Sequence, residues 1–90
     1  MSSTKVESSD SLIREEIKFY EDFVKRLSDS VADDGRTPAK ISTDAGIGAN
    51  TLSGWIEGRR RIDISALVKI ADELCISVDW LLGRKDDPRL

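Results

Sequence analysis

The chain has 90 residues, of which 39% are hydrophobic and 34% charged, a balance typical of one globular domain with a modest core. No apolar run approaches the roughly 20 residues that a membrane-spanning helix needs, and the first ten residues lack the apolar core of a secretory signal. The single cysteine excludes an internal disulfide and fits a reducing cytoplasm, where we expect the protein to act.

Several classes of function lack the residues that they need. The sequence contains no histidine, which removes the commonest general base, the usual nucleophile pairs and most transition-metal sites. No glycine-rich phosphate loop or metal-ligand cluster accompanies the carboxylates. We therefore expect no enzyme activity, no metal and no cofactor.

Charge is unevenly distributed along the chain. The net charge is −3, which by itself argues against a nucleic-acid partner. Residues 36–61, however, hold five basic and two acidic residues, whereas the rest of the chain holds nine basic and fifteen acidic residues. A basic edge on an acidic body still attracts phosphate while limiting non-specific binding. The alternative for the run Arg59–Arg61 alone is a solvated stretch of charge without a partner.

The N-terminal third predicts a short arm followed by a long helix. Residues 1–10 are rich in serine and poor in large apolar residues, so we expect a disordered arm. From Ile13 to Val31 the apolar residues recur at steps of three and four, and Gly35 is a typical helix end. The first half of this helix either packs over the core or pairs with a second copy of the chain, as in a coiled coil.

Residues 37–58 predict two short helices joined by a tight turn. Thr37 and Pro38 are typical of a helix N-cap and first helical residue. This helix is expected to end near Asp44, and Gly46 then supplies the positive φ of a sharp turn.

The helix expected over residues 49–57 has two different faces. Plotted at about 100° per residue, it has Leu52, Trp55 and Ile56 on one face and short polar side chains with Gly54 on the other. This is the layout of a helix-turn-helix whose second helix enters the major groove of DNA. Gly54 either allows close approach of a base or relieves crowding against a neighbouring helix.

Two further helices complete the pattern. Asp63 is a typical N-cap for the first, and Ser77 for a short last helix over residues 78–82, which Gly83 closes. Apolar residues at helical spacing predict the core face of the longer helix: Ile64, Leu67, Val68, Ala71, Leu74 and Cys75.

An ordered set of short motifs runs through residues 37–83. The set comprises Ile41, Ala45-Gly46-Ile47, Thr51-Leu52-Ser53, Trp55, Gly58-Arg59-Arg60, Leu67-Val68-Lys69-Ile70-Ala71 and Ile76-Ser77-Val78-Asp79-Trp80-Leu81-Leu82-Gly83. In this order and spacing it resembles the lambda-repressor-like helix-turn-helix family, of the Cro and phage-repressor type. The resemblance implies an all-α fold, a compact bundle of about five helices preceded here by an extended N-terminal helix. The expected domain covers residues 11–83 with its core in 23–83, between the arm of residues 1–10 and a tail or linker of residues 84–90.

The resemblance also implies a function. Members of the family are sequence-specific DNA-binding transcription regulators, and this chain is most similar to the N-terminal domain of a temperate-phage repressor. Such repressors occupy a palindromic operator on double-stranded DNA as a dimer. Base contacts in the family come from the start and outer face of the third bundle helix, which implies Ala49, Asn50, Thr51, Ser53 and Gly54. Asn50 is the foremost of these, because an amide can pair bidentately with adenine.

Phosphate contacts in the family come from the start of the second bundle helix and the loop after the third. Carried onto this chain, they are Thr37, Lys40, Arg59, Arg60 and Arg61. The chain departs from the family pattern at two positions. Pro38 stands where glutamine is common and removes an amide donor, and Ile56 stands where an acid is common, which points to packing at that position.

Dimer contacts are expected on the first or the last helix. The candidates are Ile13, Ile17, Tyr20, Trp80 and Leu81. The alternative function is a helical protein-interaction module, such as an antitoxin or an antirepressor-binding domain, which the acidic balance and the apolar stripe from Ile13 to Val24 favour. An antirepressor or other regulatory protein is a further expected partner. We do not expect the protein to bind a membrane.

Overall fold

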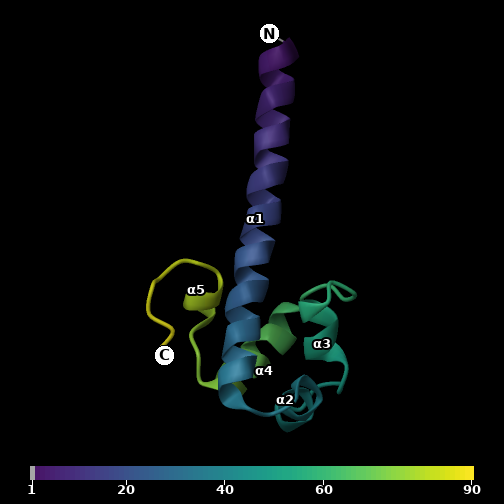
Figure 1. Cartoon of the computed structure of the whole chain (residues 1–90), viewed down its shortest axis with the longest axis vertical. Coiled ribbons are helices and arrows are strands. Elements are labelled where there is room, and N and C mark those ends of the chain that lie inside the picture. The colour runs from purple at the N-terminus through teal and green to yellow at the C-terminus, as the bar shows by residue number, and fades with distance from the viewer. Residues whose placement is uncertain (1) are drawn as a thin grey trace.

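Five helices make up the described part of the chain. The computed structural model describes the backbone of residues 2–90 and the side chains of residues 14–90. In chain order the helices are α1 (Ser2–Asp34), α2 (Pro38–Asp44), α3 (Thr51–Ile56), α4 (Ile64–Leu74) and α5 (Val78–Leu81). No strand occurs in this part of the chain, so the predicted all-α fold with five helices is confirmed (Figure 1).

α1 is longer than the sequence led us to expect. It contains 33 residues and begins at Ser2, so that residues 2–10 continue the helix where a disordered arm was predicted. No glycine or proline interrupts residues 2–34, and nothing in the local sequence forces a later start. The helix ends as predicted at Gly35, which has φ 88° and donates its amide to the Val31 carbonyl at 3.3 Å. Its first half projects beyond the other four helices (Figure 1).

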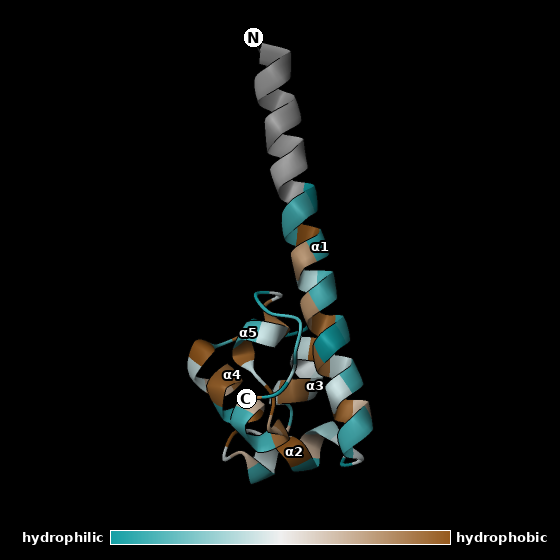
Figure 2. Cartoon of the chain, turned by 90° about the vertical axis from the view of Figure 1, so that its left-hand side faces the viewer, coloured by the Kyte–Doolittle hydropathy of each residue, from teal (hydrophilic) through white to brown (hydrophobic). Residues whose placement is uncertain are grey.

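The second half of α1 packs on the core. Phe23, Leu27 and Val31 are four residues apart and only 2%, 0% and 8% exposed. Residues at this spacing share one face of a helix, so the stripe that the sequence predicted is buried from Phe23 onward. Figure 2 shows the hydrophobic positions gathered where this half of α1 meets the shorter helices.

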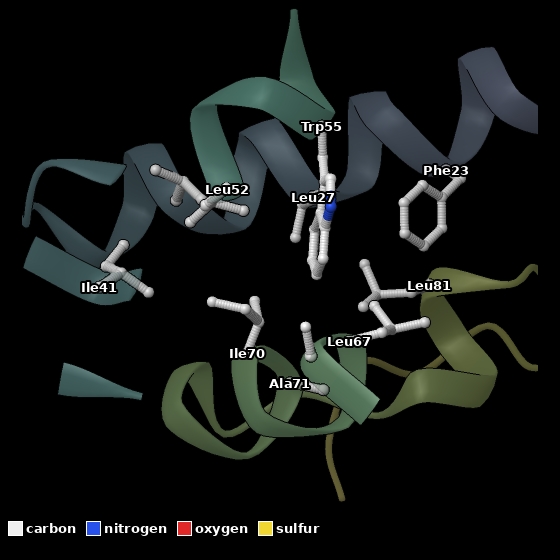
Figure 3. Packing of buried hydrophobic residues seen from close by; sticks show 11 residues of the cluster. Phe23, Leu27, Ile41, Leu52, Trp55, Leu67, Ile70, Ala71 and Leu81 are labelled. Carbon is white, nitrogen blue, oxygen red and sulfur yellow. The ribbon is translucent and has the colours of Figure 1, made fainter. Parts of the chain in front are cut away.

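All five helices contribute to one core. Its buried apolar residues are Phe23, Leu27, Val31, Ile41, Leu52, Trp55, Ala66, Leu67, Ile70, Ala71 and Leu81. The indole of Trp55 points from α3 into the space between α1 and α4 (Figure 3). The core therefore holds α3 from its inner side, as predicted for Leu52 and Trp55.

Three residues that we placed in the core of α4 are exposed instead. Ile64 is 78% exposed, Val68 is 45% exposed, and Cys75 is exposed as well. Ile64 and Val68 lie four residues apart at the edge of the face that α4 buries. Cys75 has φ 57°, a left-handed conformation that ends the helix and takes its side chain off that face.

The last two helices have the predicted caps. The Asp63 carboxylate accepts from the Ala66 amide at 3.1 Å, and the Ser77 hydroxyl accepts from the Trp80 amide at 3.3 Å. The Ser77 amide donates to the Pro88 carbonyl at 2.8 Å. The segment 84–90 therefore folds back against the start of α5.

Candidate nucleic-acid interface

α2 begins with a capped end. The Thr37 hydroxyl accepts a hydrogen bond from the Lys40 amide at 3.1 Å, and Pro38 occupies the first turn of the helix. Gly46 follows the helix with φ 83°, a conformation that glycine adopts without steric strain. The predicted cap, first residue and turn are confirmed.

A buried hydroxyl joins α2 to α3. Ser42 is 0% exposed, and its Oγ accepts a hydrogen bond from the Leu52 amide at 3.3 Å. The Ser42 carbonyl also accepts from the Ile47 amide at 3.0 Å, within the turn between the two helices. Since the Leu52 side chain lies in the core, both its backbone and its side chain fix α3 in place. Ser42 was not among the predicted site residues, and its only signal in the sequence is its place beside Ile41 on α2.

The exposed start of α3 lies two residues later than predicted. The helix spans Thr51–Ile56, whereas the sequence favoured residues 49–57. Ala49 and Asn50 belong to the turn that leads into α3, and both are exposed. The Asn50 side chain makes no capping hydrogen bond. Its amide is therefore available to a ligand at this edge of the molecule.

The next two polar side chains are engaged within the protein. Thr51 Oγ1 accepts a hydrogen bond from Arg60 Nη1 at 3.1 Å, and Ser53 Oγ donates to the Asn50 carbonyl at 3.3 Å. Thr51 and Ser53 are both half-buried. A hydroxyl donates and accepts at once, so each retains capacity for a further partner.

The Arg60 side chain covers Gly54, which corrects the placement of this glycine among the base-contact candidates. It is buried, and a Cβ at this position would lie 2.7 Å from both Cγ and Cδ of Arg60. Its carbonyl accepts from the amides of Arg59 at 2.8 Å and Arg60 at 3.1 Å. The glycine therefore relieves crowding, as the alternative interpretation held, but its neighbour is the Arg60 side chain and not a helix.

Carboxylates neutralise part of the predicted basic edge. Lys40 Nζ lies 2.9 Å from Asp44 Oδ1, and Arg59 Nη2 lies 3.1 Å from Glu57 Oε2. The hydrogen bond from Lys40, and after it that from Arg36, holds the pKa of Asp44 below its usual value. Exposed pairs of this kind contribute little stability in water, so Lys40 and Arg59 can exchange their carboxylates for a phosphate.

Arg36 belongs to an ion cluster that shares Asp44 with Lys40. Its guanidinium lies 2.7 Å from Asp34, 3.0 Å from Asp44 and 2.7 Å from Glu73. These hydrogen bonds, the one to Asp34 above all, raise the pKa of Arg36, and Arg36 in turn lowers the pKa of Asp34. The cluster connects the end of α1 to α2 and α4. Arg36 therefore stabilises the fold, although the charge count had placed it among the residues of the basic edge.

The five dimer candidates do not form one surface. Ile17 and Tyr20 are 53% and 59% exposed on α1, and the Ile13 side chain lies outside the described residues. Trp80 lines a different hollow, together with the C-terminal segment and the end of α1. Leu81 is 0% exposed and packs beside Leu67 in the core, so it was wrong as a dimer contact (Figure 3).

An apolar groove runs between α1 and the α4–α5 end of the bundle. Its volume is about 350 Å³, and its exposed lining includes Tyr20 on one side and Ile64 and Val68 on the other. We call it the α1–α4 groove, and the residues that line it are Phe19, Tyr20, Phe23, Ile62, Ile64, Leu67, Val68, Val78 and Leu82. The groove was not predicted from the sequence, because the apolar spacing of Ile64 and Val68 placed both residues in the core.

Two further findings concern the part of the chain that the structure describes. None of the helices there is long and apolar enough to cross a membrane. No cluster of three or more cysteine, aspartate or glutamate side chains in that part is arranged to hold a metal ion.

Comparison with known proteins identifies the family. The model of the helix-turn-helix family matches residues 34–81, more than half of the chain, and covers α2 to α5. No curated protein and no solved structure matches the chain. The matched region holds the capped α2, the glycine turn and the exposed start of α3. The chain therefore belongs to the lambda-repressor-like helix-turn-helix family of DNA-binding transcription regulators.

Proposed function

We propose that the protein is a phage-type transcriptional repressor that occupies a palindromic operator as a homodimer. The observation that carries this proposal is the exposed turn at Ala49 and Asn50 directly before α3, a helix that Leu52 and Trp55 anchor in the core. A firmly held helix with short side chains at its exposed end can approach base edges in the major groove. Repression follows from occupation of a promoter and needs no chemical step. The protein would act in the cytoplasm of a bacterial cell, on the nucleoid when bound.

Base reading would centre on Asn50. Its amide offers both a donor and an acceptor, which match N6 and N7 of adenine. Ala49 is short enough to meet a thymine methyl group, and the hydroxyls of Thr51 and Ser53 can each accept or donate one further hydrogen bond. The exposed position of Asn50 and the absence of a capping hydrogen bond from its side chain support this assignment.

Phosphate binding would come from both sides of α3. Thr37 and Lys40 lie at the start of α2, while Arg59 and Arg61 lie in the loop after α3. Contacts of this kind set the position and orientation of a protein on the duplex without reading its sequence. The weak, exposed pairs of Lys40 and Arg59 support their exchange for phosphate.

The α1–α4 groove is our proposed dimer surface. Phe19, Tyr20, Ile64 and Val68 are all large, at least 45% exposed and gathered at this one groove. Contiguous exposed apolar surface marks interaction sites on soluble proteins. Two copies joined here would present two copies of α3 to successive major grooves about 34 Å apart.

A protein-interaction module remains the second candidate. The net charge of −3, the carboxylate partners of Lys40 and Arg59, and the α1–α4 groove favour it. The groove would then receive a different protein, such as an antirepressor or, in an antitoxin, its toxin.

Salt dependence of DNA binding separates the two candidates. Binding to a random-sequence duplex is measured between about 50 and 200 mM salt, where each phosphate contact contributes about −0.9 to the slope of log K against log salt. A repressor gives a slope of several units, and a slope near zero would favour the interaction module. Selection of bound sequences from a random pool then reports the half-site spacing, which we expect at about 10 base pairs for a dimer.

A further inference from the structure

Arg60 turns back from the loop and lies along α3. Its Cγ and Cδ would each be 2.7 Å from a Cβ at Gly54, and its Nη1 donates to Thr51 Oγ1 at 3.1 Å. The guanidinium is thereby brought to the first residue of α3, one position from Asn50 in the chain. The loop residue therefore supplies a long side chain to a helix whose own exposed residues are short.

Three separate contacts hold Arg60 in this position. Its amide donates to the Gly54 carbonyl at 3.1 Å, its aliphatic stem covers the glycine, and its guanidinium bonds Thr51. The space under the stem exists only because residue 54 lacks a Cβ, since a methyl group at 2.7 Å would displace the arginine. A side chain fixed at its base, stem and tip is pre-organised for recognition.

The position of the guanidinium, at the first residue of α3 and one residue from Asn50, favours a base over a phosphate as its partner. Arginine has five N–H donors, and one bond to Thr51 leaves a pair free for two acceptors. Arg59 is paired with Glu57, whereas no ion pair of Arg60 with a carboxylate occurs among the described side chains. The bidentate contact of arginine with O6 and N7 of guanine is the commonest specific contact in the major groove.

We propose that Arg60 is a base-reading residue that recognises a guanine beside the base read by Asn50. This assignment rests on the proposed function, because it requires α3 to lie in the major groove. It moves Arg60 from the phosphate contacts, where the family resemblance put it, to the residues that determine specificity. Gly54 and Thr51 become positioning residues for that arginine.

The test compares two neighbouring arginines on one set of duplexes. The probe is an operator selected by the wild-type protein from a random pool, together with all its single base-pair variants. Arg60→Lys keeps the charge but loses the bidentate fork. We expect it to lower discrimination about 10- to 100-fold at one G·C pair of the half-site and to leave the other positions unchanged. The matched control Arg61→Lys alters a proposed phosphate contact, so any change in its affinity should be the same on every duplex.

Gly54→Ala provides a second, independent variant. It leaves Arg60 in the sequence but displaces its stem, so it should reduce discrimination at the same G·C pair, while thermal melting reports whether the bundle remains folded. A uniform loss of affinity with Arg60→Lys would make Arg60 a phosphate contact and overturn the proposal, as would a selected half-site without a preferred guanine. If the wild-type protein selects no sequence at all, the proposed function itself fails.

Discussion

The amide of Leu52 donates a hydrogen bond to the buried hydroxyl of Ser42 at 3.3 Å, and this bond joins the two helices of the helix-turn-helix. Leu52 also fills the core with its side chain, so one residue anchors α3 in two ways. The start of α3 therefore has a fixed orientation relative to the start of α2. These two anchors hold a helix of only six residues firmly on the bundle.

Removal of the Ser42 hydroxyl should destabilise the domain. Ser42→Ala leaves the Leu52 amide buried without an acceptor, which costs about 1–3 kcal/mol of unfolding free energy. Urea unfolding measures the loss. Ser65→Ala, at an exposed serine of α4, is the control and should change stability by less than about 0.5 kcal/mol. Equal free energies of unfolding for the two variants would show that this hydrogen bond does not stabilise the domain.

The turn after α2 should tolerate a side chain at one glycine and not at another. Gly46 has φ 83°, so Gly46→Ala forces a left-handed alanine and should cost about 1–2 kcal/mol. Gly48 has no positive φ, and a Cβ there would meet only Thr51 Oγ1 at 3.4 Å. Gly48→Ala should therefore be close to neutral in the same urea titration. The reverse order of the two variants would contradict the turn geometry.

The Arg36 cluster should make stability depend on pH in the acid range. The pKa values of Asp34 and Asp44 are lowered in the folded state, so the unfolded chain takes up protons first as the pH falls. The stabilisation is complete above about pH 4, near the unfolded carboxyl pKa, and is lost as the pH falls through the lowered values.

Arg36→Gln tests this cluster by thermal melting. The wild-type protein should melt at a higher temperature than the variant at pH 6, and the gap should narrow toward pH 3. Lys25→Gln is the control, because the Lys25–Asp29 pair is 76% and 63% exposed and should contribute almost nothing. A gap for Arg36→Gln that stays constant with pH would count against the ionic origin of the effect.

Replacement of Asn50 should lower the affinity for a specific operator and leave the affinity for non-specific DNA unchanged. Asn50→Ala removes a bidentate base contact and should cost about 1–3 kcal/mol on the selected operator. Affinity for a shuffled duplex should remain unchanged. Arg61→Ala, which removes a phosphate contact, should weaken both duplexes alike. Unchanged operator affinity with Asn50→Ala would remove Asn50 from the reading residues.

A charge in the α1–α4 groove should separate the proposed dimer. Val68→Lys places an ammonium group among Tyr20, Ile64 and their neighbours, and burying it unpaired in an interface is unfavourable. We expect the dimer dissociation constant from sedimentation equilibrium to rise at least tenfold, or about 1.4 kcal/mol. Leu90→Lys changes an equally apolar, 78% exposed residue outside the groove and should leave association unaltered. Equal association of both variants with the wild type would exclude the groove as the interface.

Local chemistry made much of the fold predictable. The caps at Thr37, Asp63 and Ser77 and the glycine ends at residues 35 and 46 depend on neighbours a few positions away. Apolar spacing likewise identified Leu52 and Trp55 as the inner face of α3. Such features need no knowledge of the tertiary arrangement.

The rest depends on contacts between distant parts of the chain. Arg36 donates a hydrogen bond to Glu73, which lies 37 residues later in the chain. No local sequence pattern distinguishes Arg36 from a basic residue on the surface. The loop after α3 folds back and places Arg60 over Gly54, and a helical projection of α3 alone cannot show that the glycine is covered. Ile64 and Val68 continue the apolar pattern of α4, but no element in the part of the chain that the structure describes covers them.

Sequence-specific binding by α3 is tested most simply by the ratio of two DNA affinities at one salt concentration. The first duplex is the operator selected from a random pool, and the second has the same base composition in shuffled order. A sequence-specific regulator should bind the operator at least about 10³-fold more tightly. Equal affinity for the two duplexes would contradict the account of α3 as a reading helix.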